Sequence, residues 1–96
     1  MKRILCAAIW YNDNEEHQHQ PFNIKIGFVV AGRGHHNCLT TIYIIDPKFK
    51  DKKYRGVQGF ITNDNLFVER EEAAIIAFDS GQINKQKSKL FSEDLF

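Results

Sequence analysis

Hydrophobic and polar positions divide this chain into apolar segments separated by polar connections. Residues 3–11 are apolar and rich in strand formers without strict alternation, which predicts a first strand covered on both faces. Residues 12–22 hold no apolar side chain until their last two positions, so we expect an exposed loop. Residues 23–31 alternate loosely between apolar and polar positions, which predicts a half-buried second strand that ends at Gly32.

The segment after the turn at residues 32–37 fits two structures. Apolar side chains from Cys38 to Ile45 follow a helical stripe of three turns. The β-branched residues between Thr40 and Ile45 would equally suit a strand. We favour the helix, ended by Asp46-Pro47 because a residue before proline is pushed out of the α region.

The second half of the chain begins with a charged connection, residues 48–56, which is typical of a solvated loop. Residues 57–62 and 66–68 then predict a hairpin, because the Asn/Asp turn between them tolerates positive φ.

A second helix is predicted from Glu69 to the glycine at position 81. Carboxylates occupy its first turn, where the helix dipole favours them, and alanines and isoleucines supply its buried stripe. A polar linker follows at residues 84–89. The closing residues 90–96 carry four large apolar side chains, which should dock on the domain.

These elements predict an α+β fold in a single domain spanning residues 1–96, with a mainly antiparallel sheet, two helices and a docked C-terminal segment. A chain this short has only a modest core. Its 8 Phe, 3 Tyr and 1 Trp exceed what that core requires, so we expect a homo-oligomer.

Charge and cysteine content narrow the function classes. Lys and Arg outnumber Asp and Glu by only 13 to 12, which argues against a nucleic-acid polymer as partner but leaves a small anion possible. No stretch approaches the length of a membrane helix, and the short apolar run near the N-terminus breaks too early for a signal peptide. The 2 cysteines fit a reduced compartment, so we expect a cytosolic protein without membrane contact.

The glycine-rich turn at residues 32–37 is the strongest candidate for chemistry. Gly32 and Gly34 let the backbone approach an anion closely, a helix start presents free N–H groups, and Arg33 can bind phosphate through two parallel hydrogen bonds. The spacing matches neither the Walker nor the dinucleotide-binding pattern. The alternative is a tight turn that carries a surface arginine.

Metal binding and nucleophilic catalysis are less favoured. The histidines at positions 17, 19, 35 and 36 do not have the spacing of a structural zinc site, so we expect no metal and no cofactor. His35 could approach Cys38 at helical spacing, but the apolar context of Cys38 would keep its thiol unreactive. A histidine acting as general base on a bound phosphodiester stays open.

Arg70 at the start of the second helix has two interpretations. It can bond the neighbouring carboxylates, or it can reach a ligand or a subunit interface. Phe60 and Phe67 on the hairpin are more simply core residues, but a ring stacked on a base is a common partner of such an arginine.

Several segments together resemble a family of small phage-encoded proteins. The resemblance covers the chain from about residue 30 onward. It is carried by GRGHHNC at 32–38, QGFIT at 58–62, FVEREEA at 67–73, GQI at 81–83 and LFSEDL at 90–95. These proteins are similar to the first Thoeris anti-defence family, viral sponges that sequester cyclic nucleotide immune signals without cleaving them. Two positions depart from the pattern, since Gly34 replaces a second basic residue and Phe96 replaces a final Trp.

That resemblance implies a dimer or hexamer in the host bacterial cytoplasm that binds a cyclic ADP-ribose isomer or a cyclic oligonucleotide. Arg33 and Arg70 would then contact phosphate, and His35 would match the turn histidine. Our leading hypothesis is a non-catalytic phosphate-bearing nucleotide binder. Its full set of expected ligand-binding residues is Arg33, Gly34, His35, His36, Arg70, Phe60 and Tyr11. The alternatives are a protein-binding inhibitor of a bacterial defence system and a small nucleotide-signal hydrolase.

Overall fold

The computed structural model describes residues 1–96 and contains one sheet and two α-helices. The strands are β1 (Ile4–Tyr11), β2 (Phe28–Gly32), β3 (Val57–Thr62) and β4 (Phe67–Glu69); the helices are α1 (His35–Ile45) and α2 (Arg70–Asp79). Short 3-10 turns η1 (Pro47–Lys50), η2 (Lys52–Tyr54) and η3 (Ser92–Asp94) complete the chain. The predicted α+β class with an antiparallel sheet and two helices is confirmed.

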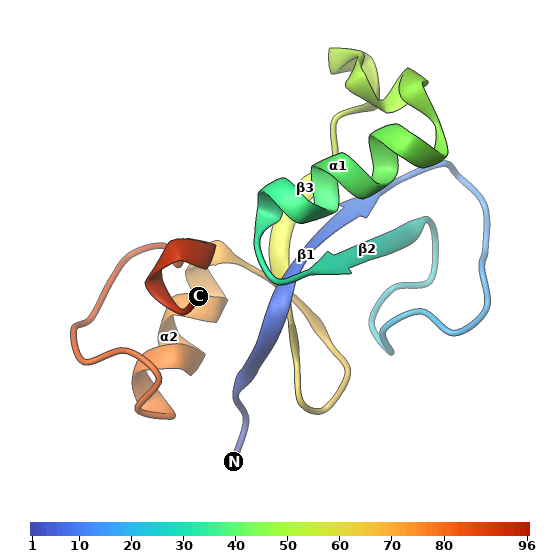
Figure 1. The fold of residues 1–96 in the computed structure, drawn as a ribbon. Coiled ribbons are helices and arrows are strands. Elements are labelled where there is room, and N and C mark those ends of the chain that lie inside the picture. Colours follow the sequence, from blue (N-terminus) through green and yellow to red (C-terminus); the bar gives the residue numbers. More distant parts are fainter.

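Strand β1 lies at the centre of the four-stranded sheet, whose order is β2-β1-β3-β4. It pairs antiparallel with β2 on one side and with β3 on the other, so β2 and β3 run parallel with α1 in the crossover between them (Figure 1). The predicted hairpin is confirmed as β3 and β4, with Phe60 opposite Val68. β1 and β3 therefore form the interior of the sheet, and β2 and β4 form its edges.

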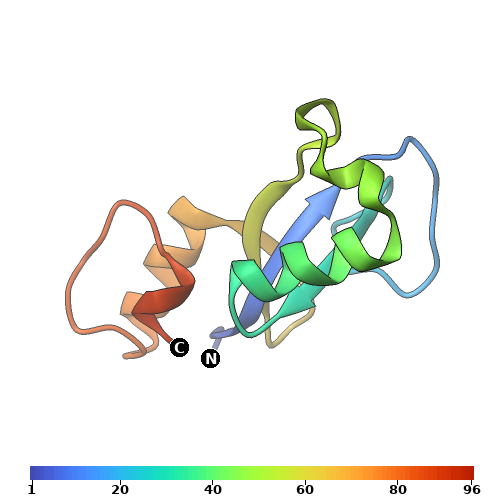
Figure 2. The same cartoon turned by 45° about the horizontal axis from the view of Figure 1, so that its top comes forward.

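Both helices pack on the same face of this sheet. Ala7 of β1 is opposite Phe60 of β3, and Phe60 is opposite Val68 of β4, so the three side chains share a face. They belong to one buried cluster with Cys38 of α1 and Ala73 of α2. Figure 2 shows α1 lying across β1 and β2, and α2 apart from α1 on the other side of β3. This arrangement brings the first turns of α1 and α2 near the same part of the sheet.

The helix interpretation of residues 38–45 is confirmed, but α1 begins at His35 rather than at Cys38. Gly34 precedes it in an extended conformation, and its backbone N–H donates to the Asn37 side chain at 3.0 Å. That contact is half of a capping box. It turns the expected loop residues 35–37 into the first turn of the helix.

The second strand is shorter than predicted, because β2 begins at Phe28 and not at residue 23. Gly27 adopts a positive φ of 85°, which no extended strand accommodates. The Trp10 indole donates to the Ile26 carbonyl at 2.8 Å, and the Asn23 side chain bonds both backbone groups of Phe67. Residues 23–27 thus belong to the long connection after β1.

The C-terminal segment, residues 90–96, docks beside α2 as expected. Leu90 is fully buried in the core, and its N–H donates to the Arg70 carbonyl at 3.0 Å. Leu95 packs on the same core, whereas Phe91 and Phe96 stay partly exposed. Gly81, with φ 80°, follows the end of α2 as its sequence position predicted. No helix of the protein combines the length and apolar character needed to cross a bilayer.

Candidate ligand-binding site

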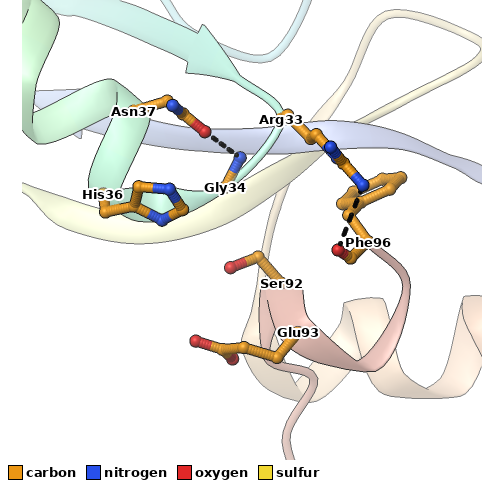
Figure 3. A pocket seen from close by; sticks show the side chains of 7 residues that line it. All are labelled: Arg33, Gly34, His36, Asn37, Ser92, Glu93 and Phe96. Atoms are coloured by element: carbon orange, nitrogen blue, oxygen red, sulfur yellow. Dashed lines mark hydrogen bonds between the residues drawn. The ribbon is translucent and has the colours of Figure 1, made fainter.

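A cavity of about 510 Å³ lies between the first turn of α1 and the C-terminal segment. Its lining comes from two parts of the chain that are far apart in sequence (Figure 3): Arg33, Gly34, His36 and Asn37 from one, and Ser92, Glu93 and Phe96 from the other. Only one of these residues is hydrophobic, so the cavity suits a polar ligand.

Arg33 is the cation of this cavity. Its side chain is exposed and forms no ion pair, and its single hydrogen bond is a long one, 3.5 Å from Nη2 to the Phe96 carbonyl oxygen. Figure 3 shows the guanidinium beside the C-terminal segment at the edge of the cavity. Most of its five N–H donors are therefore free for a carboxylate or a phosphate.

The backbone N–H groups of the turn are less available than expected. The Gly34 N–H is bonded to Asn37 at 3.0 Å, and the His35 N–H to the Ser92 hydroxyl at 3.4 Å. A Cβ at position 34 would lie 2.9 Å from the His36 ring, which is exposed and can move aside. The expectation that the Gly34 N–H is a free donor is therefore wrong within the single chain, because Asn37 already accepts from it.

The two adjacent histidines have different environments. His35 is buried, and its Nε2 lies 2.8 Å from the Gly59 carbonyl oxygen, with its ring edge-on to Phe60 at 5.1 Å between centroids. Burial lowers the pKa of His35, and the positive charge of Arg70 acts in the same direction. The neutral ring therefore donates to Gly59, and only His36 lines the cavity.

Arg70 does not line the cavity with Arg33. Its Nη1 donates to the Leu90 carbonyl at 3.0 Å, its Nη2 donates to the Gln58 side chain, and its guanidinium lies 4.5 Å from the centre of the Phe91 ring. Arg70 thus fastens the C-terminal segment to β3 and α2. The phosphate contact of Arg70 stays a prediction; within the single chain its guanidinium binds Leu90 and Gln58 instead of lining this cavity.

Phe60 and Tyr11, the two aromatic residues in the expected ligand-binding set, do not line this cavity. Phe60 is fully buried beneath His35, and Tyr11 is 2% exposed. Tyr11 packs against Phe28 and Phe49, with ring centroids at 5.6 Å and 5.0 Å. Neither residue lines the cavity at Arg33, because both point into the face of the sheet that the helices cover.

Cys38 is a core residue, as expected. Its Sγ lies 3.8 Å from the Ala7 carbonyl oxygen, and burial raises the pKa of its thiol to about 11, so the thiolate is absent near neutral pH. No group of three His, Cys, Asp or Glu side chains is arranged to hold a metal ion.

Four residues that line the cavity were missed from sequence: Asn37, Ser92, Glu93 and Phe96. Asn37 could have been found from a local signal. Its amide side chain lies three positions after Gly34, the residue that precedes α1, and this is the spacing of a capping box. Ser92 and Glu93 lie in the closing segment. Their proximity to the turn at residue 33 comes from the docking of Leu90 and has no local signature.

The separate segments that carry the phage-protein resemblance meet in the structure. His35 contacts Gly59 and Ser92, while Arg70 contacts Gln58 and Leu90. The model of a family described as the phage T4 y16D protein matches residues 3–96. The chain belongs to this family.

Membership in the phage T4 y16D family confirms the coarser half of the resemblance, a small phage protein. No curated protein and no solved structure matches the chain. The family's description names no activity, so the closer similarity to the Thoeris anti-defence proteins stays a hypothesis about function.

Proposed function

We propose that this phage protein binds a small phosphate-bearing nucleotide in the cavity beside Arg33 and holds it without breaking a bond. One observation carries the proposal: an arginine without an ionic partner faces a polar cavity at the start of a helix, beside His36. The guanidinium supplies a fork that matches phosphate oxygens, and the first turn of α1 adds the positive end of its dipole.

The opposite wall of the cavity suits the rest of a nucleotide. The Glu93 carboxylate is exposed and accepts from ribose hydroxyls or an exocyclic amine, so it complements groups that lie away from the phosphate. In Figure 3 the His36 ring and the Glu93 carboxylate lie on facing sides, one from α1 and one from the C-terminal segment. A ligand held between them would bridge these two parts of the chain.

Sequestration fits the cavity better than hydrolysis through a thiol, because neither cysteine lines it. Both cysteines are at least half-buried with raised pKa values, so no thiolate is available as a nucleophile. The buried His35 is committed to Gly59. Within this proposal the ligand is a cyclic ADP-ribose isomer or a cyclic oligonucleotide, and the protein acts in the host cytoplasm as an anti-defence protein.

The proposed assembly is a homo-oligomer, a dimer or a hexamer. Ile44 and Ile45 at the end of α1 are 78% and 70% exposed, which gives a second copy an apolar surface. Light scattering after gel filtration measures the assembly independently of any ligand.

The test is capture and heat release. The protein is incubated with cyclic ADP-ribose or cyclic di-AMP, separated from free ligand, denatured by heat, and the supernatant is analysed by mass spectrometry. Intact ligand supports sequestration, altered ligand supports the hydrolase alternative, and no capture of either probe contradicts the proposal and favours the protein-binding inhibitor.

Two variants sharpen the test. Arg33→Ala should weaken capture at least tenfold, because a hydrogen bond to a charged group contributes about 1.5–3 kcal/mol. Arg3→Ala is the matched control, since Arg3 is an exposed arginine whose side chain has no hydrogen bond or ion pair. Equal losses in both variants would show that general charge, and not the cavity, binds the probe.

A further inference from the structure

A second cavity, of about 470 Å³, lies along the flank of α1 near η1, η2 and the start of β3. Leu39 and Tyr43 of α1 line it together with Tyr11 and Phe49. Its rim carries Lys50, Lys52 and Arg55. It shares no lining residue with the cavity at Arg33.

The cations at this rim have no ionic partners. The protein contains ion pairs at Lys2, His17, Lys48 and Lys87, and none at Lys50, Lys52 or Arg55. Asp51 is the one carboxylate of the cavity, and its Oδ1 accepts from the Lys53 N–H at 3.1 Å to begin η2. Positive charge therefore exceeds negative charge at the rim, which favours an anion.

The cavity walls add a hydrogen-bond donor and aromatic surface. The Tyr11 hydroxyl has no hydrogen-bond partner in the protein, and although Tyr11 is only 2% exposed, no unpartnered polar side-chain atom is fully sealed from solvent. Burial raises the pKa of Tyr11 to about 12, so the hydroxyl remains a donor near neutral pH. Tyr43 and Phe49 are half-buried, and Lys50 Nζ lies 5.8 Å from the centre of the Tyr43 ring.

We propose that this cavity is a second binding site, which takes a planar ring bearing a phosphate monoester, such as a nucleoside monophosphate. Lys50, Lys52 and Arg55 bind the phosphate, the Tyr11 hydroxyl donates a hydrogen bond, and the ring lies against Tyr43 and Phe49. Aromatic walls with cations at the rim are what such a ligand requires. The volume is within the range of small-molecule sites.

This site is independent of the proposed function at Arg33, because each can fail alone. The probe is adenosine 5′-monophosphate, added to the full chain labelled with nitrogen-15, with amide shifts as the readout. We expect saturable shifts in residues 50–58 and at Tyr43, with a dissociation constant below about 1 mM. Adenosine and inorganic phosphate alone should each bind at least severalfold more weakly.

Point variants identify which side chains bind the phosphate and which bind the ring. Arg55→Ala should weaken binding by roughly ten- to a hundredfold, and Arg55→Lys by less, because lysine keeps the charge and loses the planar fork. Tyr11→Phe keeps the ring and should cost severalfold. Arg33→Ala, in the other cavity, should leave the affinity unchanged, as should Arg3→Ala.

Three results would overturn the site. The first is the absence of saturable shifts with adenosine 5′-monophosphate. The second is shifts confined to residues 33–37, which would place the ligand in the other cavity only. The third is equal affinity for adenosine and its monophosphate, which would show that the cations do not bind the phosphate. Arg55 has no side-chain partner, so its variants should fold, and Lys52→Ala provides a second charge deletion at the same rim.

Discussion

Leu90 anchors the C-terminal segment, and truncating it to alanine tests how the candidate site is built. The side chain is fully buried in the core. Removing its three outer carbons costs about 2.4 kcal/mol at 0.8 kcal/mol per buried methylene-sized group, and an incompletely filled cavity raises this to about 3 kcal/mol. For a domain of this size, 1 kcal/mol corresponds to roughly 4–8 °C, so Tm should fall by roughly 12–24 °C.

Thermal unfolding followed by circular dichroism measures this cost, with Phe91→Ala as the control. Phe91 is next in sequence but 45% exposed, and it contacts the Arg70 guanidinium at 4.5 Å. Losing that contact should cost only about 0.5–1 kcal/mol. If Leu90→Ala lowers Tm no more than Phe91→Ala does, the segment is not held by the core, and the placement of Ser92 and Glu93 beside Arg33 loses its support.

The remaining predictions concern a titration, a strand contact and a loop. The pKa of His35 is lower in the folded protein than in the unfolded chain, so the unfolded chain binds a proton more readily. The contribution of His35 to the free energy of unfolding is therefore fully present above the unfolded pKa of 6.5, and it is lost as the pH falls through the lowered pKa. Urea titrations should show this loss in the native protein and not in His35→Gln, and an identical pH profile in both would contradict it. Gly59→Ala should destabilise by about 2 kcal/mol or more in the same assay, because its Cβ would lie 2.3 Å from the Val68 carbonyl oxygen; an unchanged midpoint would refute the close packing of β3 and β4. Asn23→Ala removes two hydrogen bonds to Phe67 and should cost about 1–2 kcal/mol, whereas Asn84→Ala, in the exposed linker and without a side-chain hydrogen bond, should be neutral.

The sequence was most informative where the pattern is local. The hairpin and α2 were predictable because turn residues and first-turn carboxylates act within a few positions. The prediction of a strand at residues 23–27 was wrong because their apolar side chains alternate as they do in a strand. Positive φ at Gly27 and the tryptophan contact to Ile26 are set by the rest of the fold.

The candidate site was predictable only in part for the same reason. Arg33 and His36 are adjacent to a recognisable turn, and the structure places both at one cavity. Whether Arg70 reached that cavity depended on the position of Leu90 and Gln58, which are 20 and 12 residues away in sequence. Local patterns could identify the charged residue but not its tertiary partner.

The long connection after β1 has a consequence for the exposed edges of the sheet. Gln20 accepts from the Val29 N–H, and Asn23 bonds the N–H and carbonyl of Phe67, so amide side chains occupy backbone groups of the two outermost strands, β2 and β4. Open sheet edges recruit further strands and promote aggregation. By covering positions on both edges, one loop disfavours growth of the sheet by strand addition and so protects the protein against aggregation.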